Sequence, residues 1–69
     1  MEREPVTSKS IAAIGYEPDT ETLEVEFRTS GIYHYLNVPP FMHERLMTAD
    51  SVGTFFNAEI KNAYPCQKL

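Results

Sequence analysis

The segment TLEVEFR alternates apolar and polar side chains without a break and is the clearest structural element of the chain. Because successive side chains of a strand point to opposite faces, Leu23, Val25 and Phe27 share one face, while Glu24 and Glu26 share the other. The pattern predicts a strand of an antiparallel sheet that has one buried face and one face in water.

Two further strands and two helices are predicted around this segment. SIAAIGYE precedes it and ends at a turn with the sequence EPDT, and GIYHYLNV follows it and ends at Pro39. Pro40 suits the first turn of a helix over FMHERLMTAD, and Asp50 or Ser51 can cap a second helix over SVGTFFNAEIKNAY. The sequence therefore predicts an α+β fold, with a three-stranded antiparallel β-meander followed by two α-helices packed on one face.

The chain has 69 residues, which fits one small domain with a single core. Residues 1–5 are interpreted as a mobile N-terminal arm, residues 6–64 as the domain, and residues 65–69 as a C-terminal tail. A domain this small needs nearly all of its aromatic and aliphatic side chains for packing, which favours a structural interpretation of each of them.

The segment TSG, which separates the second and third strands, decides where two tyrosines point. If it forms a three-residue loop in which Gly31 adopts the left-handed conformation, Tyr33 lies opposite Phe27 and Tyr35 lies opposite Val25. Both tyrosines then join the buried face. A two-residue loop would shift the register by one and turn both rings outward, so the three-residue loop is favoured because it uses glycine where a positive φ is needed.

The opposite face of the third strand is predicted to lie in water. In the favoured register, His34 faces Glu26 as a surface pair, and Ile32 and Leu36 are left on the open face of the sheet. Exposed apolar residues on an open face can bind a partner, so Ile32, His34 and Leu36 form a candidate protein interface.

No pattern of catalytic or metal-binding residues stands out. His34 and His43 are the only histidines, and neither has a cysteine or a second histidine at the spacing of zinc ligands. Cys66 has no predicted base nearby, and no serine can be placed beside a histidine and an acid. We therefore expect no enzyme activity, no metal and no cofactor.

Cellular location is constrained by two features of the composition. Cys66 is the only cysteine and cannot form an internal disulfide, which points to a reducing compartment and hence to the cytoplasm. No segment approaches the roughly 20 consecutive apolar residues that a membrane-spanning helix needs, so no membrane association is expected.

The charge of the chain limits how it could bind a nucleic acid. Ten acidic and six basic residues give a net charge of −4, which has the wrong sign for general attraction to phosphate. Binding would need a local cluster of basic residues with aromatic rings that stack on bases. The candidate nucleic-acid contacts are Lys9, Arg45, Lys61 and Lys68, together with Tyr33 and Tyr35, although packing in the core is the favoured role of the tyrosines.

Several segments, in a fixed order, resemble the KTSC domain, named for the C-terminus of certain lysyl-tRNA synthetases. They are I-x-x-I-G-Y from Ile11, L-x-V-x-F from Leu23, the Tyr33-x-Tyr35 pair with Val38-Pro39, and A-x-S-x-G from Ala49 with Phe56-Asn57 and Ile60. The resemblance covers roughly residues 6–64. His43 departs from the family, which often has an aromatic residue such as tyrosine there.

The resemblance implies a small module without an established activity, found both attached to the synthetase and as free-standing proteins of bacteria and phages. Its association with the synthetase implies binding to RNA, including tRNA. Two hypotheses follow: a non-catalytic RNA-binding module that uses the basic and aromatic candidates above, or a module for protein interaction or self-association that uses the open sheet face.

Overall fold

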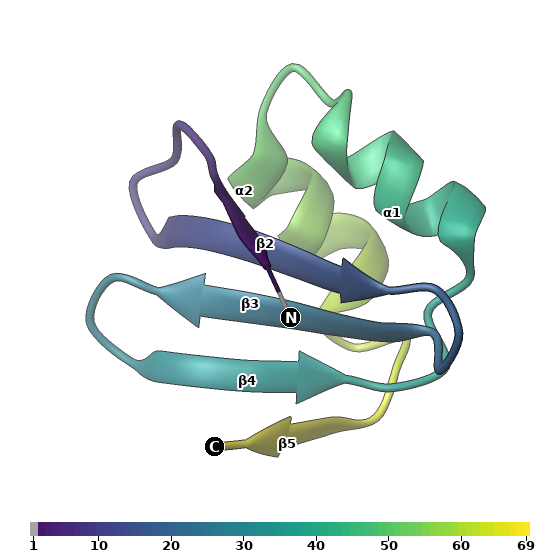
Figure 1. The fold of residues 1–69 in the computed structure, drawn as a ribbon. Coiled ribbons are helices and arrows are strands. Elements are labelled where there is room, and N and C mark those ends of the chain that lie inside the picture. The colour runs from purple at the N-terminus through teal and green to yellow at the C-terminus, as the bar shows by residue number, and fades with distance from the viewer. Residues whose placement is uncertain (1) are drawn as a thin grey trace.

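The computed structural model describes residues 2–69 as a curved antiparallel sheet with the helices on one of its faces (Figure 1). The strands follow the order of the chain across the sheet and are β1 (Arg3–Pro5), β2 (Ile11–Glu17), β3 (Thr22–Phe27), β4 (Gly31–Tyr35) and β5 (Cys66–Lys68). The helices are α1 (Pro40–Met47), α2 (Val52–Phe55) and η1 (Phe56–Ile60). The α+β class, the central meander and the helices on one face are confirmed.

The predicted number of strands, three, was too low because both ends of the chain form edge strands. β1 pairs with β2 and β5 pairs with β4, so the segments interpreted as an arm and a tail contain the two edges of the sheet. All residues of β1 and β5 are exposed and neither strand alternates in polarity. Backbone hydrogen bonds to an existing sheet hold them, and these leave no pattern in the sequence.

A β-bulge in β2 reconciles two buried residues that a regular strand would place on opposite faces. Ile11 and Ile14 are three residues apart, yet both are almost completely buried. The register shifts between Ile11 and Ala13, so Ala12 is the additional residue. A bulge adds one residue to one strand and thereby turns the next side chain to the other face. Both isoleucines consequently reach the core.

The β3–β4 hairpin has the predicted loop length but a different register. The loop consists of Arg28, Thr29 and Ser30, and Gly31, with φ of 95°, is already the first residue of β4. Tyr33 therefore pairs with Val25 and Tyr35 with Leu23, which corrects both predicted partners. Moving a three-residue loop by one residue changes the register by two, so both tyrosines keep the predicted face.

The prediction that His34 faces Glu26 was also wrong, since His34 pairs with Glu24 and Ile32 with Glu26. Glu24, which was expected in water, is buried. Along one row of the sheet, Arg3 pairs with Gly15, Gly15 with Glu24 and Glu24 with His34. Glu24 is covered because Arg3, on one side of it in this row, and His34, on the other side, both bind its carboxylate.

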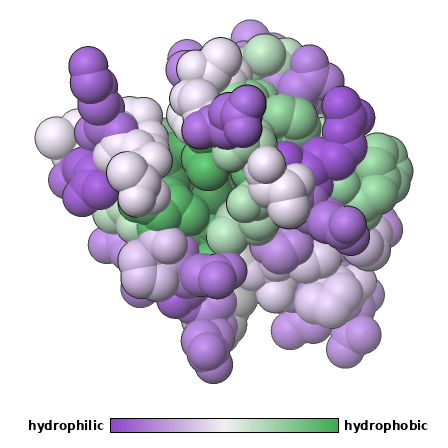
Figure 2. Space-filling model, turned by 90° about the horizontal axis from the view of Figure 1, so that it is seen from above, coloured by the Kyte–Doolittle hydropathy of each residue, from purple (hydrophilic) through white to green (hydrophobic). Residues whose placement is uncertain are grey.

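The helices close the core against the inner face of the sheet. Buried residues of β2, β3 and β4 meet Met42 and Leu46 of α1 and Phe56 and Ile60 of η1. The Phe56 ring contacts the Tyr35 ring edge to face, with ring centres 5.2 Å apart. Viewed from above, hydrophobic atoms are visible in a hollow that hydrophilic atoms surround (Figure 2).

The helical segments start as predicted, but the second one is irregular. Pro40 begins α1, and Ser51 caps α2 by accepting a hydrogen bond of 3.3 Å from the backbone N–H of Thr54. After Phe55 the helix continues as the π-helix η1, which ends at Ile60 and not at the end of the predicted segment SVGTFFNAEIKNAY. None of the helices within residues 2–69 has the length and apolar character required to cross a membrane.

Candidate functional site

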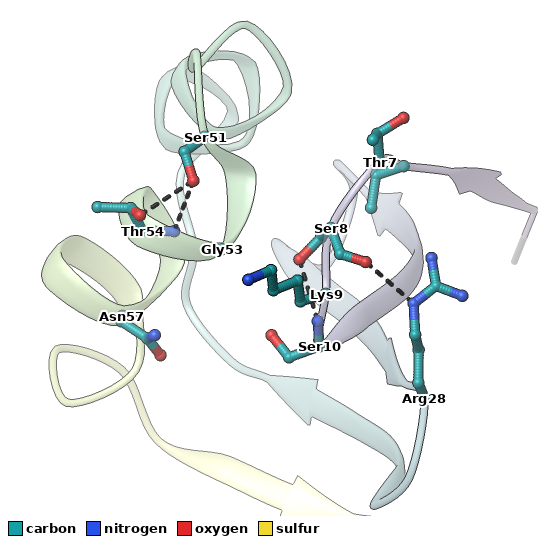
Figure 3. Close-up of a pocket in the computed structure, with 10 residues that line it drawn as sticks. Thr7, Ser8, Lys9, Ser10, Arg28, Ser51, Gly53, Thr54 and Asn57 are labelled. Carbon is teal, nitrogen blue, oxygen red and sulfur yellow. Dashed lines mark hydrogen bonds between the residues drawn. The ribbon is translucent and has the colours of Figure 1, made fainter.

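A hollow with a volume of about 660 Å³ lies between the segment that leads into β2 and the helix α2 (Figure 3). Hydroxyl groups dominate its wall, and they belong to Thr7, Ser8, Ser10, Ser51 and Thr54. Val6, Lys9, Arg28, Gly53 and Asn57 complete the lining. We call this hollow the hydroxyl pocket. Figure 3 shows the Lys9 side chain extending from the β2 side of the pocket toward α2.

Ser8 fixes the wall that precedes β2. Its Oγ accepts hydrogen bonds from the backbone N–H groups of Ser10 and Ile11, each 3.3 Å long. Its carbonyl oxygen accepts a hydrogen bond of 3.0 Å from Nε of Arg28. No other hydrogen bond of Arg28 side-chain nitrogens occurs within residues 2–69, so both Nη groups can bind an anionic ligand.

The opposite wall approaches Ser8 closely at Gly53. A Cβ atom at position 53 would lie 3.1 Å from Oγ of Ser8, which is tighter than an ordinary van der Waals contact. Beside it, the Ser51 hydroxyl donates a hydrogen bond of 2.9 Å to Oγ1 of Thr54 and also caps α2. Both walls of the hydroxyl pocket are therefore fixed by contacts within the protein.

A second hollow, of about 580 Å³, lies between β4 and η1. Four aromatic rings line it, from Phe27, Tyr33, Tyr35 and Phe56. Polar groups of Ser30, Lys61, Asn62 and Cys66 also reach it. We call it the aromatic pocket. Because Ser10 and Asn57 line both pockets, the two meet, and we refer to them together as the basic groove.

The aromatic rings hold one another in place. Phe27 contacts Tyr33 edge to face at 5.4 Å and Phe56 at 5.6 Å between ring centres. The Lys68 ammonium lies 6.0 Å from the centre of the Tyr33 ring, within the range of a cation–π contact. Burial, followed by the neighbouring Cys66 thiol, raises the pKa of Tyr35 to about 12. The Tyr35 phenol therefore keeps its proton at neutral pH.

The basic groove concentrates positive charge in an acidic protein. Lys9, Arg28 and Lys61 line it, and Lys68 lies over the ring of Tyr33. These are four of the six basic residues of a chain whose net charge is −4. Within residues 2–69, neither pocket of the groove is lined by an aspartate or a glutamate. The acidic side chains thus lie outside the lining of the groove.

The structure brings most of the predicted nucleic-acid contacts together. Lys9, Lys61, Tyr33 and Tyr35 line the groove and Lys68 adjoins it, although Tyr35 is buried and belongs to the core. Arg45 lines neither pocket of the groove. Its guanidinium is 5.5 Å from the centre of the Phe55 ring, in a third hollow lined also by Asp50 and Glu59, which shares Ser51 and Thr54 with the hydroxyl pocket.

Arg28 is a groove residue that the sequence prediction missed. The prediction included it in the strand as the last residue of TLEVEFR, whereas it lies in the loop after β3. Its backbone N–H donates a hydrogen bond of 2.9 Å to the carbonyl oxygen of Ser10, which continues the pairing of β2 with β3 beyond Ile11 and Phe27. The sequence offered one indication that Arg28 lies in the loop: it directly follows Phe27, the last apolar residue of the alternating pattern.

The open face of the sheet carries an ion-pair row. Nη1 of Arg3 lies 3.1 Å from one carboxylate oxygen of Glu24, and Nε2 of His34 lies 2.8 Å from the other. Gly15 separates Arg3 from Glu24 in the row and has no side chain in the way. Ile32 and His34 lie on this face and Leu36 follows β4 in the same alternation, and all three are half-buried.

Within residues 2–69, no three or more side chains of His, Cys, Asp or Glu gather at a distance that would hold a metal ion. The free thiol of Cys66 is exposed at the aromatic pocket. The groups that the basic groove offers to a ligand are therefore its cations, hydroxyl groups and aromatic rings.

Comparison with known proteins agrees with the fold and the motifs. The KTSC domain family matches residues 7–64. The chain belongs to the KTSC domain family. The crystal structure of a KTSC domain protein from Yersinia pestis superposes with a TM-score of 0.97 at 46% sequence identity, covering 99% of this chain and 96% of that one.

Relatives of this KTSC protein occur in two settings. An uncharacterized protein of Stutzerimonas stutzeri is 41% identical over 61 residues, which are 88% of this chain and 86% of that protein. A lysine–tRNA ligase of Nostoc punctiforme is 39% identical over 59 residues, which are 86% of this chain but only 10% of the ligase. The similarity to the ligase therefore concerns one small part of that enzyme.

Several residues that carry the family resemblance also line the basic groove, namely Phe27, Tyr33, Tyr35, Ser51, Gly53, Phe56 and Asn57. His43, which departs from the family pattern, lies outside the groove. Its ring stacks on Tyr16 with centres 4.5 Å apart and planes 7° apart, so it fills the place of a flat aromatic ring.

Proposed function

We propose that this KTSC protein is a non-catalytic module that binds RNA in the basic groove. The observation that carries the proposal is the clustering of Lys9, Arg28, Lys61 and Lys68 around a groove whose lining, within residues 2–69, lacks acidic side chains. Lysine and arginine bind phosphate, and serine and threonine hydroxyl groups bind phosphate and sugar oxygens.

The relatives support this choice of ligand. The lysine–tRNA ligases that contain a similar segment act, by their name, on a tRNA. A segment that adds a local basic groove to such an enzyme would add contacts to the nucleic acid. For the present protein we propose a cytoplasmic location, because its single cysteine, Cys66, has no partner for a disulfide within the chain.

Binding of a labelled RNA tests the proposal directly. The chain contains no tryptophan, so the fluorescent label belongs on the RNA, which can be a tRNA or a short single strand. We expect an increase in fluorescence anisotropy with micromolar protein at low ionic strength. Lys61→Glu should weaken binding by about tenfold or more, because it replaces a phosphate-binding charge by a repulsive one.

Arg45→Glu is the matched control. It changes the net charge by the same amount at an exposed position that lines neither pocket of the basic groove. At about 0.15 M salt, where the screening length is about 8 Å, we expect it to weaken binding clearly less than Lys61→Glu does. The absence of any binding at low ionic strength, or equal losses in the two variants, contradicts the proposal.

The uncovered face of the sheet favours a second candidate, interaction with a protein or with a second copy of the chain. The helices cover only the other face (Figure 1), and Ile32 and Leu36 are incompletely buried beside His34. Leu36→Glu should abolish such an association while the fold is kept. Light scattering after gel filtration measures it, and a wild-type protein that is monomeric and captures no partner contradicts this candidate.

A further inference from the structure

We propose that the aromatic pocket holds one unpaired nucleobase while the hydroxyl pocket holds the neighbouring phosphate, so that the RNA bound is single-stranded. This inference rests on the proposed function and assigns a separate ligand group to each half of the basic groove.

The wall of the aromatic pocket suits a flat, uncharged ring. Tyr33 is half-buried, and its contact with Phe27 at 5.4 Å and 87° fixes the ring before a ligand arrives. Phe27 is itself held by Phe56 at 5.6 Å. Rings fixed in this way lose little conformational freedom when a base packs against them, and stacking on aromatic side chains is a common way to bind unpaired bases.

The rim supplies groups that match the edge of a base. Asn57 and Asn62 each offer an amide with donors and an acceptor, and Ser30 offers a hydroxyl. The volume of about 580 Å³ lies within the range of roughly 300–1,000 Å³ that small-ligand sites occupy. These side chains are exposed and can pair with the polar edge of a heterocyclic ring, which an aliphatic ligand does not have.

The junction of the pockets sets the position of the phosphate. Ser10 and Asn57 belong to both linings, so a base in the aromatic pocket places its backbone beside Lys9 and Arg28. The free Nη groups of Arg28 are suited to two phosphate oxygens. Bases inside a duplex are stacked and paired and cannot enter a pocket, so this arrangement excludes double-stranded RNA.

Three labelled RNAs distinguish a base site from mere charge attraction: a single strand of uridines, an abasic strand of the same length, and a duplex. We expect the wild-type protein to bind the uridine strand roughly tenfold more tightly than the abasic strand, which carries the same phosphates. Tyr33→Leu should bind both strands equally, at the level at which the wild type binds the abasic one.

Phe41→Leu is the matched control, because Phe41 is an exposed aromatic residue of α1 that lines neither pocket. It should keep the preference for bases. Asn62→Ala removes only an exposed polar side chain that lines the aromatic pocket, and it should also reduce the preference for bases. This variant provides a second test in case Tyr33→Leu does not fold.

The outcomes separate the two proposals. If no RNA binds, both the proposed function and the base site fall. If the wild type binds RNA but does not distinguish the uridine strand from the abasic strand, the base site alone is overturned and the groove is an electrostatic phosphate site. Tighter binding of the duplex than of the uridine strand also overturns the base site.

Discussion

Gly31 sets the geometry of the β3–β4 hairpin through its backbone. Its φ of 95° is a conformation that residues with a Cβ rarely adopt, whereas space is not the constraint, since a Cβ would meet only Cε of Lys68 at 3.9 Å. We expect Gly31→Ala to lower the free energy of unfolding by roughly 1–2 kcal/mol.

Urea unfolding followed by circular dichroism measures this loss. Ser30→Ala is the control, because Ser30 is an exposed neighbour in the same loop and its replacement should change stability by less than about 0.5 kcal/mol. Equal midpoints for the two variants would show that the positive φ at position 31 carries no cost for alanine.

His43 makes stability depend on pH. Burial of its ring lowers the pKa of His43 below the usual 6.5, and Glu4 acts in the opposite direction without reversing the shift. Below the pKa of the unfolded chain, the unfolded state therefore binds more protons at this residue than the folded state does. The free energy of unfolding should consequently fall as the pH drops through about 6.5, until the folded-state pKa is passed.

The comparison variant for this residue is His43→Phe, which keeps a flat ring against Tyr16 and cannot be protonated. Between pH 7.5 and pH 5, chosen on either side of about 6.5, the wild type should lose more stability than the variant. His34→Gln, measured over the same pH interval, shows whether the other histidine contributes to the loss of stability. A variant that loses as much stability as the wild type, or more, would show that His43 does not carry this dependence.

At the scale of elements, the sequence predicted what side-chain polarity encodes. The alternation of Leu23, Val25 and Phe27 predicted β3, and Pro40 and Ser51 marked the starts of the helices. The edge strands, the bulge at Ala12 and the π-helix η1 depend on which backbone groups find partners after the sheet and helices have packed. No single segment contains that information.

The edge strand β5 illustrates how much an unpatterned element contributes. Tyr33 pairs with Lys68 and Tyr35 with Cys66, and the N–H of Leu69 donates a hydrogen bond of 2.8 Å to the carbonyl of Ile32. Deletion of residues 66–69 leaves one side of β4 without these partners. Because each lost backbone hydrogen bond contributes about 0.5–1.5 kcal/mol, we expect a loss of at least about 1 kcal/mol.

Gln67→Ala provides the control for the shortened chain, since it keeps the backbone of β5 and removes only an exposed side chain. It should unfold within about 0.5 kcal/mol of the wild type. Thermal and urea unfolding of the three proteins decide the matter, and a shortened chain as stable as the wild type would mean that β5 contributes nothing to the sheet.

For the whole molecule, the distribution of charge is the property that the linear sequence conceals. Composition indicated repulsion from nucleic acid, yet Lys9, near one end of the chain, and Lys61 and Lys68, near the other, meet at one groove. The residue types of the candidate site could be predicted because cations and aromatic rings are few. Their grouping, the addition of Arg28 and the separation of Arg45 required the positions of the strands.

This distribution makes a quantitative prediction about salt, which rests on the proposed function. For single-stranded nucleic acid, the logarithm of the binding constant falls with the logarithm of the salt concentration with a slope of roughly −0.7 per phosphate neutralised. If all four basic residues of the groove each neutralise one phosphate, the slope should be roughly −3 for the wild type and roughly −2 for Lys9→Gln. Anisotropy titrations between about 50 and 200 mM salt measure it.

Arg45→Gln removes a charge of the same sign from a residue that lines neither pocket and should change this slope less than Lys9→Gln does, because a cation that contacts no phosphate releases no counterion. A wild-type slope near zero would mean that binding does not depend on phosphate, and equal changes for Lys9→Gln and Arg45→Gln would mean that only the net charge matters. If the slope becomes clearly shallower for Lys9→Gln but not for Arg45→Gln, the phosphate contacts are assigned to the groove, despite the overall charge of −4.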